Sequence, residues 1–296
     1  MTSATPMPLT ARLTRSDILV APGVYDALTA SLAEAAGFEA VYLSGAAVAY
    51  TRLGRPDIGL TTATEMADTC ALIRDRIDVP IIIDGDTGFG NALNAQRTVR
   101  TYERAGANAI QLEDQSYPKR CGHLRDKSLI SPSEMAGKIK ATTDARLSDD
   151  TLIIARTDAV AVEGFEPAID RAALYVEAGA DVLFVEAPRT EEQLGTVVTR
   201  LGDRNVPLMA NMVEGGDTPL MDAMALQRLG FSLVIFPGGI VRALARTAQA
   251  YYQSLYNHGT TGPFRDRMFQ FGELVEIVGT SEMLAAGRQY DGTERP

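Results

Sequence analysis

The segment VPIIIDGDTGFGN, residues 79–91, is the most informative about the fold, because an apolar run of strand length ends abruptly in carboxylates and glycines. An uninterrupted apolar strand is buried on both faces, which is typical of parallel sheets. The pattern recurs along the chain. Eight strands are expected, at 17–23, 39–45, 79–86, 108–114, 151–158, 180–187, 206–212 and 231–238.

Ala-rich amphipathic stretches separate these segments, and several end in glycine just before the next strand, as glycine commonly follows a helix. Eight βα units in 296 residues predict an α/β protein with a (β/α)8 TIM barrel; a doubly wound open sheet is the alternative. Residues 240–257 and 263–287 predict a helical extension. We interpret 1–296 as one barrel domain with this extension at about 240–287, a type of extension that often packs on a neighbouring subunit.

Composition narrows the class of partner. The net charge of −10 disfavours nucleic acid and anionic membranes. There is no apolar run long enough for a transmembrane helix and no secretory signal at the N-terminus. Two cysteines, Cys70 and Cys121, do not form a disulfide framework, so a reducing cytoplasm is expected.

Polar residues follow the expected strands, where a barrel of this class carries its active site. They are Ser44, Asp84, Asp86, Glu113, Asp114, Arg156, Asp158, Glu186, Asn211 and Glu214. Asp84 and Asp86 share one side of an extended segment, and with Glu113 they supply hard oxygen ligands suited to Mg²⁺ or Mn²⁺. The competing interpretation is that the two aspartates cap the following loop or helix.

The loop PKRCGHLRDK, residues 118–127, places a cysteine among cations in an acidic protein. Lys119, Arg120 and His123 favour a thiolate or a proton-active thiol at Cys121. Gly122 and the surrounding charges indicate a lid that closes over an anionic ligand. The alternative is a surface loop whose cysteine has no role.

Eight motifs, in this order along the chain, resemble the isocitrate lyase and phosphoenolpyruvate mutase superfamily. They are YLSG (42–45), PDIGL (56–60), DGDTGFGN (84–91), LEDQ (112–115), KRCGH (119–123), ARTDA (155–159), ANMVEGGDTPL (210–220) and VRALA (241–245). The resemblance covers about residues 18 to 280 and implies a (β/α)8 barrel, a Mg²⁺ site and a homotetramer that exchanges C-terminal helices.

Site roles follow from the same resemblance. Asp84, Asp86 and Glu113 resemble the metal shell, with Asp57 as an outer partner. Tyr42 resembles the base, Cys121 the acid or base on the gating loop, and Arg156 the cationic clamp, with Lys119 also catalytic. Substrate contacts are implied for Ser44, Gly45, Ala46, Arg120, Gly122, His123, Glu186, Asn211, Pro237 and Arg242.

The implied activity is Mg²⁺-dependent cleavage of a carbon–carbon bond in a 2-hydroxy dicarboxylate of the 2,3-dimethylmalate or 2-methylisocitrate type. The products are a 2-oxo acid such as pyruvate and a carboxylate. SGAA (44–47) and Val213 with Gly215 depart from the methylisocitrate lyase pattern and favour a smaller diacid. The alternatives are a carboxyphosphonoenolpyruvate mutase, an oxaloacetate-cleaving hydrolase and a non-catalytic metabolite-binding barrel.

Overall fold

The computed structural model describes residues 7–122, 124 and 126–290, and its central feature is a closed parallel barrel. Each strand pairs with its neighbours in sequence, and β8 pairs with β1 to close the ring. The strands are β1 (Leu19–Val24), β2 (Val41–Leu43), β3 (Ile81–Asp84), β4 (Ala109–Glu113), β5 (Leu152–Thr157), β6 (Val182–Val185), β7 (Leu208–Asn211) and β8 (Leu233–Phe236). The predicted barrel is confirmed, and the open-sheet alternative is wrong.

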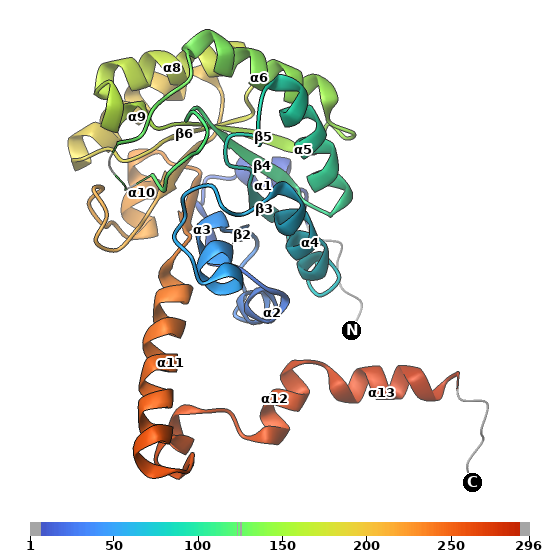
Figure 1. Cartoon of the computed structure of the whole chain (residues 1–296). Helices are drawn as coiled ribbons and strands as arrows, with labels where there is room; N and C mark the ends of the chain where they lie inside the picture. The colour runs from blue at the N-terminus through green and yellow to red at the C-terminus, as the bar shows by residue number, and fades with distance from the viewer. Residues whose placement is uncertain (1–6, 123, 125, 291–296) are drawn as a thin grey trace. The chain divides into compact units, whose positions relative to one another are not determined.

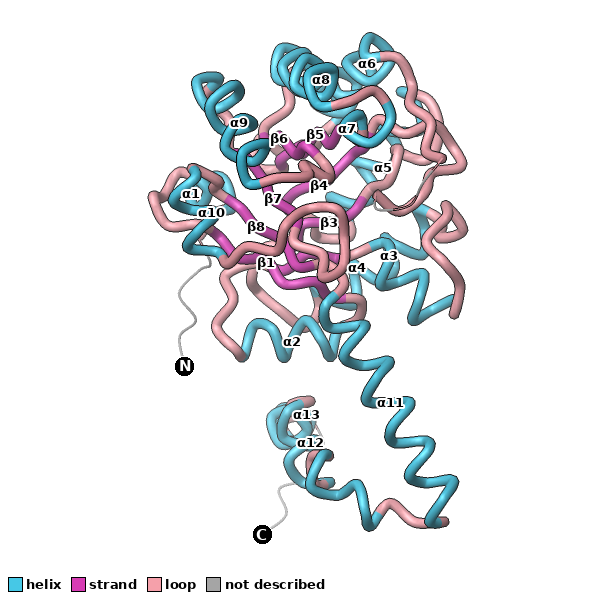
Figure 2. Tube along the Cα trace, turned by 90° about the vertical axis from the view of Figure 1, so that its left-hand side faces the viewer, coloured by secondary structure: helices cyan, strands magenta, loops and turns pink. Residues whose placement is uncertain are grey.

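Helices surround the strands, as Figures 1 and 2 show. They are α1 (Leu9–Leu13), α2 (Ala27–Ala35), α3 (Gly45–Val48), α4 (Ala63–Arg74), α5 (Ala92–Arg104), α6 (Pro132–Ala145), α7 (Ala159–Val162), α8 (Phe165–Glu177), α9 (Glu191–Leu201) and α10 (Ala223–Leu229). Their start points follow local chemistry. The Thr62 hydroxyl accepts from the Glu65 N–H while Glu65 reaches back to the Thr62 N–H, a capping box that begins α4.

The core has two layers because strand side chains alternate between the inside and the outside of the barrel. On β3, Ile82 belongs to the inner cluster, whereas Ile81 and Ile83 pack against the helices. Phe184 on β6 is also in the inner cluster. Burial on both sides explains why each strand reads as a continuous apolar run.

Helix α1 contributes to the inner layer. Leu9 and Leu13 belong to the same buried cluster as the inward-facing strand residues. Arg12 is only 4% exposed, and its guanidinium pairs with Asp17 at 3.1 Å and with Glu39 at 2.9 Å. This short helix was not predicted, since five residues without a capping side chain give little sequence signal.

The chain divides into two compact units, Met1–Val241, which contains the barrel, and Arg242–Pro296 at its C-terminal end in sequence. The second unit holds most of α11 (Gly239–His258), together with α12 (Phe271–Ile277) and α13 (Thr280–Arg288). Within it, Phe264 packs edge-on against Tyr251 at 5.4 Å between ring centroids. The helical extension is therefore present, and its exchange between subunits remains a prediction. No helix among the described residues combines the length and apolarity needed to cross a membrane.

Candidate active site

Side chains continue to alternate between the inside and the outside of the barrel beyond the strand ends, and this brings the predicted site residues together. Tyr42, Ile82, Ala109, Ile154, Phe184, Met209 and Ile235 belong to the inner cluster. Two residues further along each strand, on the same face, stand Ser44, Asp84, Gln111, Arg156, Glu186, Asn211 and Pro237. One more step on β4 reaches Glu113. The inward register, set by apolar packing, therefore aims these side chains at the carboxyl end of the barrel.

Buried carboxylates surround the ammonium group of Lys119. Its Nζ lies 2.5 Å from Asp57 Oδ1 and 2.7 Å from Asp86 Oδ1, and its side chain is 4% exposed. Burial lowers the pKa of Lys119, but Asp86 and Asp57 outweigh that effect and raise it well above its usual value. One lysine does not neutralise all of these acids. Burial, together with the negative charges of Asp84 and Asp57, therefore raises the pKa of Asp86 to about 7 even though Lys119 lowers it.

Hydrogen bonds fix the remaining acids of this cluster. Asp84 Oδ2 accepts from the Gly45 N–H at 3.3 Å, and Asp84 Oδ1 accepts from the Asp86 N–H at 3.2 Å. Asp86 has a positive φ of 47°, a conformation that is uncommon outside glycine and occurs at functional sites. Its carbonyl accepts from the Glu113 N–H at 2.9 Å, which ties β3 to β4.

Arg156 bridges two acids on the other side of the site. Its Nη1 lies 3.4 Å from Glu113 Oε2, and its Nε and Nη2 bind the two Asp158 oxygens at 2.9 and 3.0 Å. Burial raises the pKa of Glu113 well above its ordinary value. Lys127 also reaches Asp158, at 2.8 Å. Arg156 and Asp158 thus form a fixed ion pair.

The loop after β4 is closed at its base by a short antiparallel ribbon. Gln115 and Leu129 form a bridge, and the Ser116 N–H donates to the Ser128 carbonyl at 2.8 Å. The Gln115 side chain accepts from the Arg120 N–H at 2.9 Å and donates to the Arg120 carbonyl at 2.8 Å. This reciprocal pair fixes the backbone just before Cys121.

Cys121 and Gly122 lie against the site. The Cys121 N–H donates to the Asp57 carbonyl at 3.1 Å. A Cβ added to Gly122 would come within 2.3 Å of Arg156 Nη2 and 2.9 Å of Glu186. The residue that follows the predicted loop cysteine therefore lies against the predicted arginine clamp. His123 lies outside the described residues, and its predicted role stays a prediction.

The other predicted residues fall in three places. Ser44 caps α3, with Gly45 buried and Ala46 half-buried beside it. The Tyr42 hydroxyl donates to Gln111 Oε1 at 3.0 Å, and burial, together with Asp84, raises the pKa of Tyr42 well above its ordinary value. Asn211 Nδ2 donates to Glu186 at 3.1 Å.

The side chain of one predicted substrate contact, Arg120, lies apart from these buried groups. The Arg120 guanidinium is 3.4 Å from Asp126 in an ion pair whose side chains are 45% and 86% exposed. Arg242 is the first residue of the second unit, so its part in the site stays a prediction. Pro237 closes the seam between β8 and β1, where its carbonyl would lie 2.2 Å from a Cβ added to Gly23.

The donor set fits a hard divalent cation in its chemistry. Asp57, Asp84, Asp86 and Glu113 are all buried, and Glu113 Oε1 is a buried oxygen without a hydrogen-bond partner. Among the described residues, however, no three acidic, imidazole or thiol groups lie close enough together to enclose an ion directly. This arrangement fits Mg²⁺, which keeps several waters and uses one or two carboxylates.

Several residues for which the sequence predicted no catalytic or binding role make hydrogen bonds that fix the site residues in place. Gln111 donates to Asp84 Oδ1 at 3.4 Å, and Lys127 and Gln115 hold the loop. Asp114, noted only as a strand-end acid, accepts from the Thr157 and Tyr175 hydroxyls at 2.7 Å each and from the Asp158 N–H at 2.9 Å. Period-two spacing from Glu113 and Arg156 identifies Gln111 and Asp158; the sequence carries no comparable signal for Lys127.

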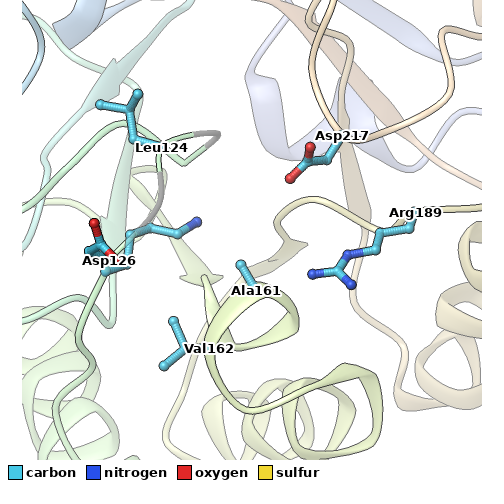
Figure 3. Close-up of a pocket in the computed structure, with 7 residues that line it drawn as sticks. Leu124, Asp126, Ala161, Val162, Arg189 and Asp217 are labelled. Carbon is cyan, nitrogen blue, oxygen red and sulfur yellow. The ribbon is translucent and has the colours of Figure 1, made fainter.

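A cavity of about 690 Å³ opens between the loops beside the site. It is lined by Leu124, Asp126, Lys127, Ala161, Val162, Arg189 and Asp217. Figure 3 shows Arg189 and Asp217 on one side of the space and Leu124 and Asp126 on the other. Its walls come from the segments after β4, β5, β6 and β7, so it lies at the carboxyl mouth of the barrel.

Enzymes built on (β/α)8 barrels carry their active sites at the carboxyl ends of the strands. The buried acids, Arg156 and the Cys121 loop lie at that end, so the fold and the site define a barrel enzyme. The family model described as phosphoenolpyruvate phosphomutase matches residues 9–256. The chain belongs to the phosphoenolpyruvate mutase/isocitrate lyase superfamily, as its motifs indicate.

Relatives and solved structures agree with this placement. The chain is 41% identical to 2,3-dimethylmalate lyase of Eubacterium barkeri over 94% of this chain and 95% of that one. It is 47% identical to 2-methylisocitrate lyase of Aeropyrum pernix, covering 90% and 84%.

Two solved structures extend the comparison. Oxaloacetate acetylhydrolase with 3,3-difluorooxalacetate is 33% identical with a TM-score of 0.92, covering 98% of each chain. Phosphonopyruvate hydrolase with oxalate and Mg²⁺ is 28% identical with a TM-score of 0.85, covering 97% of this chain and 99% of that one.

Proposed function

We propose that the protein is a Mg²⁺-dependent carbon–carbon lyase. It cleaves a 2-hydroxy dicarboxylate of the 2,3-dimethylmalate or 2-methylisocitrate type to pyruvate or another 2-oxo acid and a carboxylate. The observation that carries the proposal is the contact of the Cys121–Gly122 segment with Arg156 and Glu186. It puts Gly122, the neighbour of a thiol that can move a proton, against a guanidinium that can hold a substrate carboxylate.

The acids around Lys119 support a role for Mg²⁺. Asp84, Asp86 and Glu113 would hold the ion, directly or through water, with Asp57 as an outer partner, and Mn²⁺ is the alternative. The Mg²⁺ in the structure of phosphonopyruvate hydrolase belongs to that protein and is consistent with this assignment. When bound, the cation lowers the pKa of the substrate hydroxyl and polarises the developing carbonyl.

The chain's own residues account for the proton and charge movements. The C2 hydroxyl loses its proton, the C2–C3 bond breaks, and C3 takes up a proton while C2 becomes a carbonyl. Lys119 and Arg156 offset the negative charge that develops on the C3 fragment. Cys121 donates the proton to C3, which is the role its position beside the cationic groups suits.

The proton on the C2 hydroxyl needs a base, and Tyr42 is our candidate. With its pKa raised by burial and by Asp84, the phenol is protonated at neutral pH in the metal-free site. In that protonated form Tyr42 donates its hydrogen bond to Gln111, and it would act as the base only after losing this proton. A carboxylate of the metal cluster is the alternative base.

The substrate carboxylates meet two sets of groups. The backbone of Ser44, Gly45 and Ala46 at the start of α3, with Arg156, would hold the C1 carboxylate. A second set, Arg120, Gly122, His123, Glu186, Asn211, Pro237 and Arg242, would contact the rest of the substrate. SGAA (44–47) and Val213 with Gly215, which depart from the methylisocitrate lyase pattern, favour a diacid over a tricarboxylate.

A second candidate is oxaloacetate cleavage by water. The likeness to oxaloacetate acetylhydrolase, with a TM-score of 0.92, motivates it. The structure of 2,3-dimethylmalate lyase matches with the same TM-score, so the choice between the two activities rests on the substrate assay. Phosphonate chemistry is a third use of such a site.

We further infer that the second unit packs on neighbouring copies and that the protein works as a homotetramer in the cytoplasm. The thiol state of Cys70 and Cys121 supports a reducing compartment. The acidic net charge continues to argue against nucleic acid and membranes as partners.

A coupled assay of 2-oxo acid release tests the proposal. Purified protein with Mg²⁺ is given 2,3-dimethylmalate, 2-methylisocitrate, isocitrate and related 2-alkylmalates, with lactate dehydrogenase reporting pyruvate. We expect EDTA-sensitive release from at least one of them. No release from any, with loss of oxaloacetate instead, would move the assignment to the hydrolase.

The role of Cys121 is tested in the same assay. Cys121→Ser is expected to lower kcat by about 10²–10⁴-fold, the usual contribution of a positioned acid. Cys70→Ser, at the chain's other cysteine, which is fully buried on α4, is the matched control and keeps the wild-type kcat in the folded fraction. Near-native turnover by Cys121→Ser would remove the thiol from the mechanism.

A further inference from the structure

Lys127 stands at the end of the loop after β4 and carries no role in the proposed reaction. Its side chain is 1% exposed, which is uncommon for a lysine without a dedicated partner. The ammonium pairs with Asp158 Oδ1 at 2.8 Å and also donates to the Gly122 carbonyl. One buried cation therefore joins the loop to the segment after β5.

Each residue from 119 to 122 has its own anchor. Lys119 is held by Asp57 and Asp86, the Arg120 backbone by the Gln115 amide, and the Cys121 N–H by the Asp57 carbonyl. These three anchors come from the β2–β4 side of the mouth. The Gly122 carbonyl instead binds Lys127, whose partner Asp158 follows β5.

Asp158 is a rigid attachment point. Its carboxylate receives Arg156 through two nitrogens, and its N–H donates to Asp114 at 2.9 Å. A charge-assisted hydrogen bond to such a group is stronger than a neutral one. The contact from Lys127 therefore sets the Gly122 peptide at a fixed distance from Arg156, which Asp158 holds.

We propose that Lys127 is a positioning residue that holds the Cys121–Gly122 segment against the Arg156–Asp158 pair. The proposal rests on the proposed function for its catalytic consequence but not for its structural one. Loss of the ammonium leaves Asp158 bonded to Arg156 and frees the Gly122 carbonyl. The segment then moves away from the site, and the Cys121 thiol becomes more accessible.

Alkylation of Cys121 by iodoacetamide reports this movement without any substrate. The rate is measured on the plateau above the thiol pKa, so that a change in ionisation does not contribute. We expect Lys127→Met to react at least tenfold faster than wild type at Cys121. Lys140→Met on α6, whose ion pair with Asp144 is exposed, is the matched control and reacts at the wild-type rate.

Cys70, fully buried, monitors the fold in the same samples. A plateau rate for Lys127→Met within twofold of wild type, with Cys70 still protected, overturns the proposal. If Cys70 reacts as well, the variant has unfolded, and Lys127→Gln takes its place. Lys127→Gln must then show the faster rate, and a wild-type rate overturns the proposal equally.

Kinetics separate positioning from a general structural role. With any substrate that the wild type cleaves, Lys127→Met is expected to lower kcat about 100-fold and to change KM less than tenfold. Equal losses in kcat and in folded fraction would indicate a structural role alone. If the wild type cleaves none of the hydroxy acids, the proposed function fails while the alkylation result still decides the role of Lys127.

Discussion

Gly122 faces the tightest steric limit in the site. Its would-be Cβ lies 2.3 Å from Arg156 Nη2 and 2.9 Å from Glu186, closer than real Cβ atoms approach. Arg156 cannot move away cheaply, since Asp158 holds two of its nitrogens. A methyl group at this position must therefore push the Cys121 segment out of the site.

Gly122→Ala is accordingly expected to lower kcat/KM by at least about 100-fold, the scale of a misplacement of about 1 Å. The matched control is Gly137→Ala on α6, where an added Cβ meets nothing within 4 Å. It keeps the wild-type rate and stabilises the fold by about 0.5–1 kcal/mol. Steady-state kinetics and urea unfolding of both variants check this, and an active Gly122→Ala enzyme would contradict the close packing.

The lowered pKa of Asp158 predicts how the stability of the fold depends on pH. Burial by itself raises its pKa, but Arg156 and Lys127 outweigh burial and lower the pKa of Asp158 to about 2. Because the folded value lies below the unfolded value of about 3.9, the carboxylate stabilises the fold above about pH 4. That contribution is lost as the pH falls toward 2.

Between pH 5 and pH 3 the loss amounts to about 1 kcal/mol for this one group. Urea unfolding of wild type and Asp158→Asn at both pH values measures it, since the asparagine removes the titration. The free-energy gap between the two proteins is expected to shrink by that amount at pH 3. An unchanged gap would show that Asp158 is not held by its cations.

At the scale of elements, the strands were predictable and the short helices were not. The expected strand at 79–86 contains β3, Ile81–Asp84, because continuous burial gives a strong apolar signal. Period-two spacing along the strands then predicts that Asp84, Glu113 and Arg156 lie at the mouth of the barrel. Helix α3 runs into a π-helical turn at Ala49–Leu53, whose geometry depends on packing that no local pattern encodes.

The contacts of the loop after β4 were predictable from the sequence only in part. Its cationic residues suggested a site, and Cys121 and Lys119 do meet buried partners. Arg120 looks the same in sequence, yet its guanidinium pairs with exposed Asp126. The Gln115 amide holds the Arg120 backbone and Lys127 binds Asp158, and both contacts depend on the closed fold rather than on a local sequence pattern.

Helix α1 should matter for stability more than its length suggests. Leu13 is 5% exposed within the inner cluster, so Leu13→Ala is expected to cost about 2–5 kcal/mol. Leu72→Ala on α4, where the side chain is 65% exposed, is the control and stays within about 0.5 kcal/mol. Urea midpoints at constant slope measure both; equal midpoints would mean that α1 does not pack in the barrel.

At the scale of the molecule, the second unit exposes more apolar surface than a small helical unit normally leaves in water. Phe271, Met283 and Tyr290 are 88%, 74% and 86% exposed, and none of the residues of α12 or α13 is buried. Such a surface is suited to an interface between copies.

We therefore expect the wild type to sediment as four copies of the 31.8 kDa chain. The double variant Phe271→Ser with Met283→Ser is expected to sediment as a smaller species while the barrel stays folded by circular dichroism. Leu93→Ser on α5, also exposed at 72%, is the control and leaves the mass unchanged. A monomeric wild type at micromolar concentration would contradict the predicted tetramer.

The most direct test of the central claim is the product analysis by NMR in D₂O with Mg²⁺ and the preferred hydroxy diacid. The lyase account predicts equal amounts of a 2-oxo acid and a carboxylate, with one deuterium on the carbon that was C3, since that carbon is protonated after the bond breaks. Cleavage of oxaloacetate to oxalate and acetate, with the hydroxy diacids left intact, would contradict it.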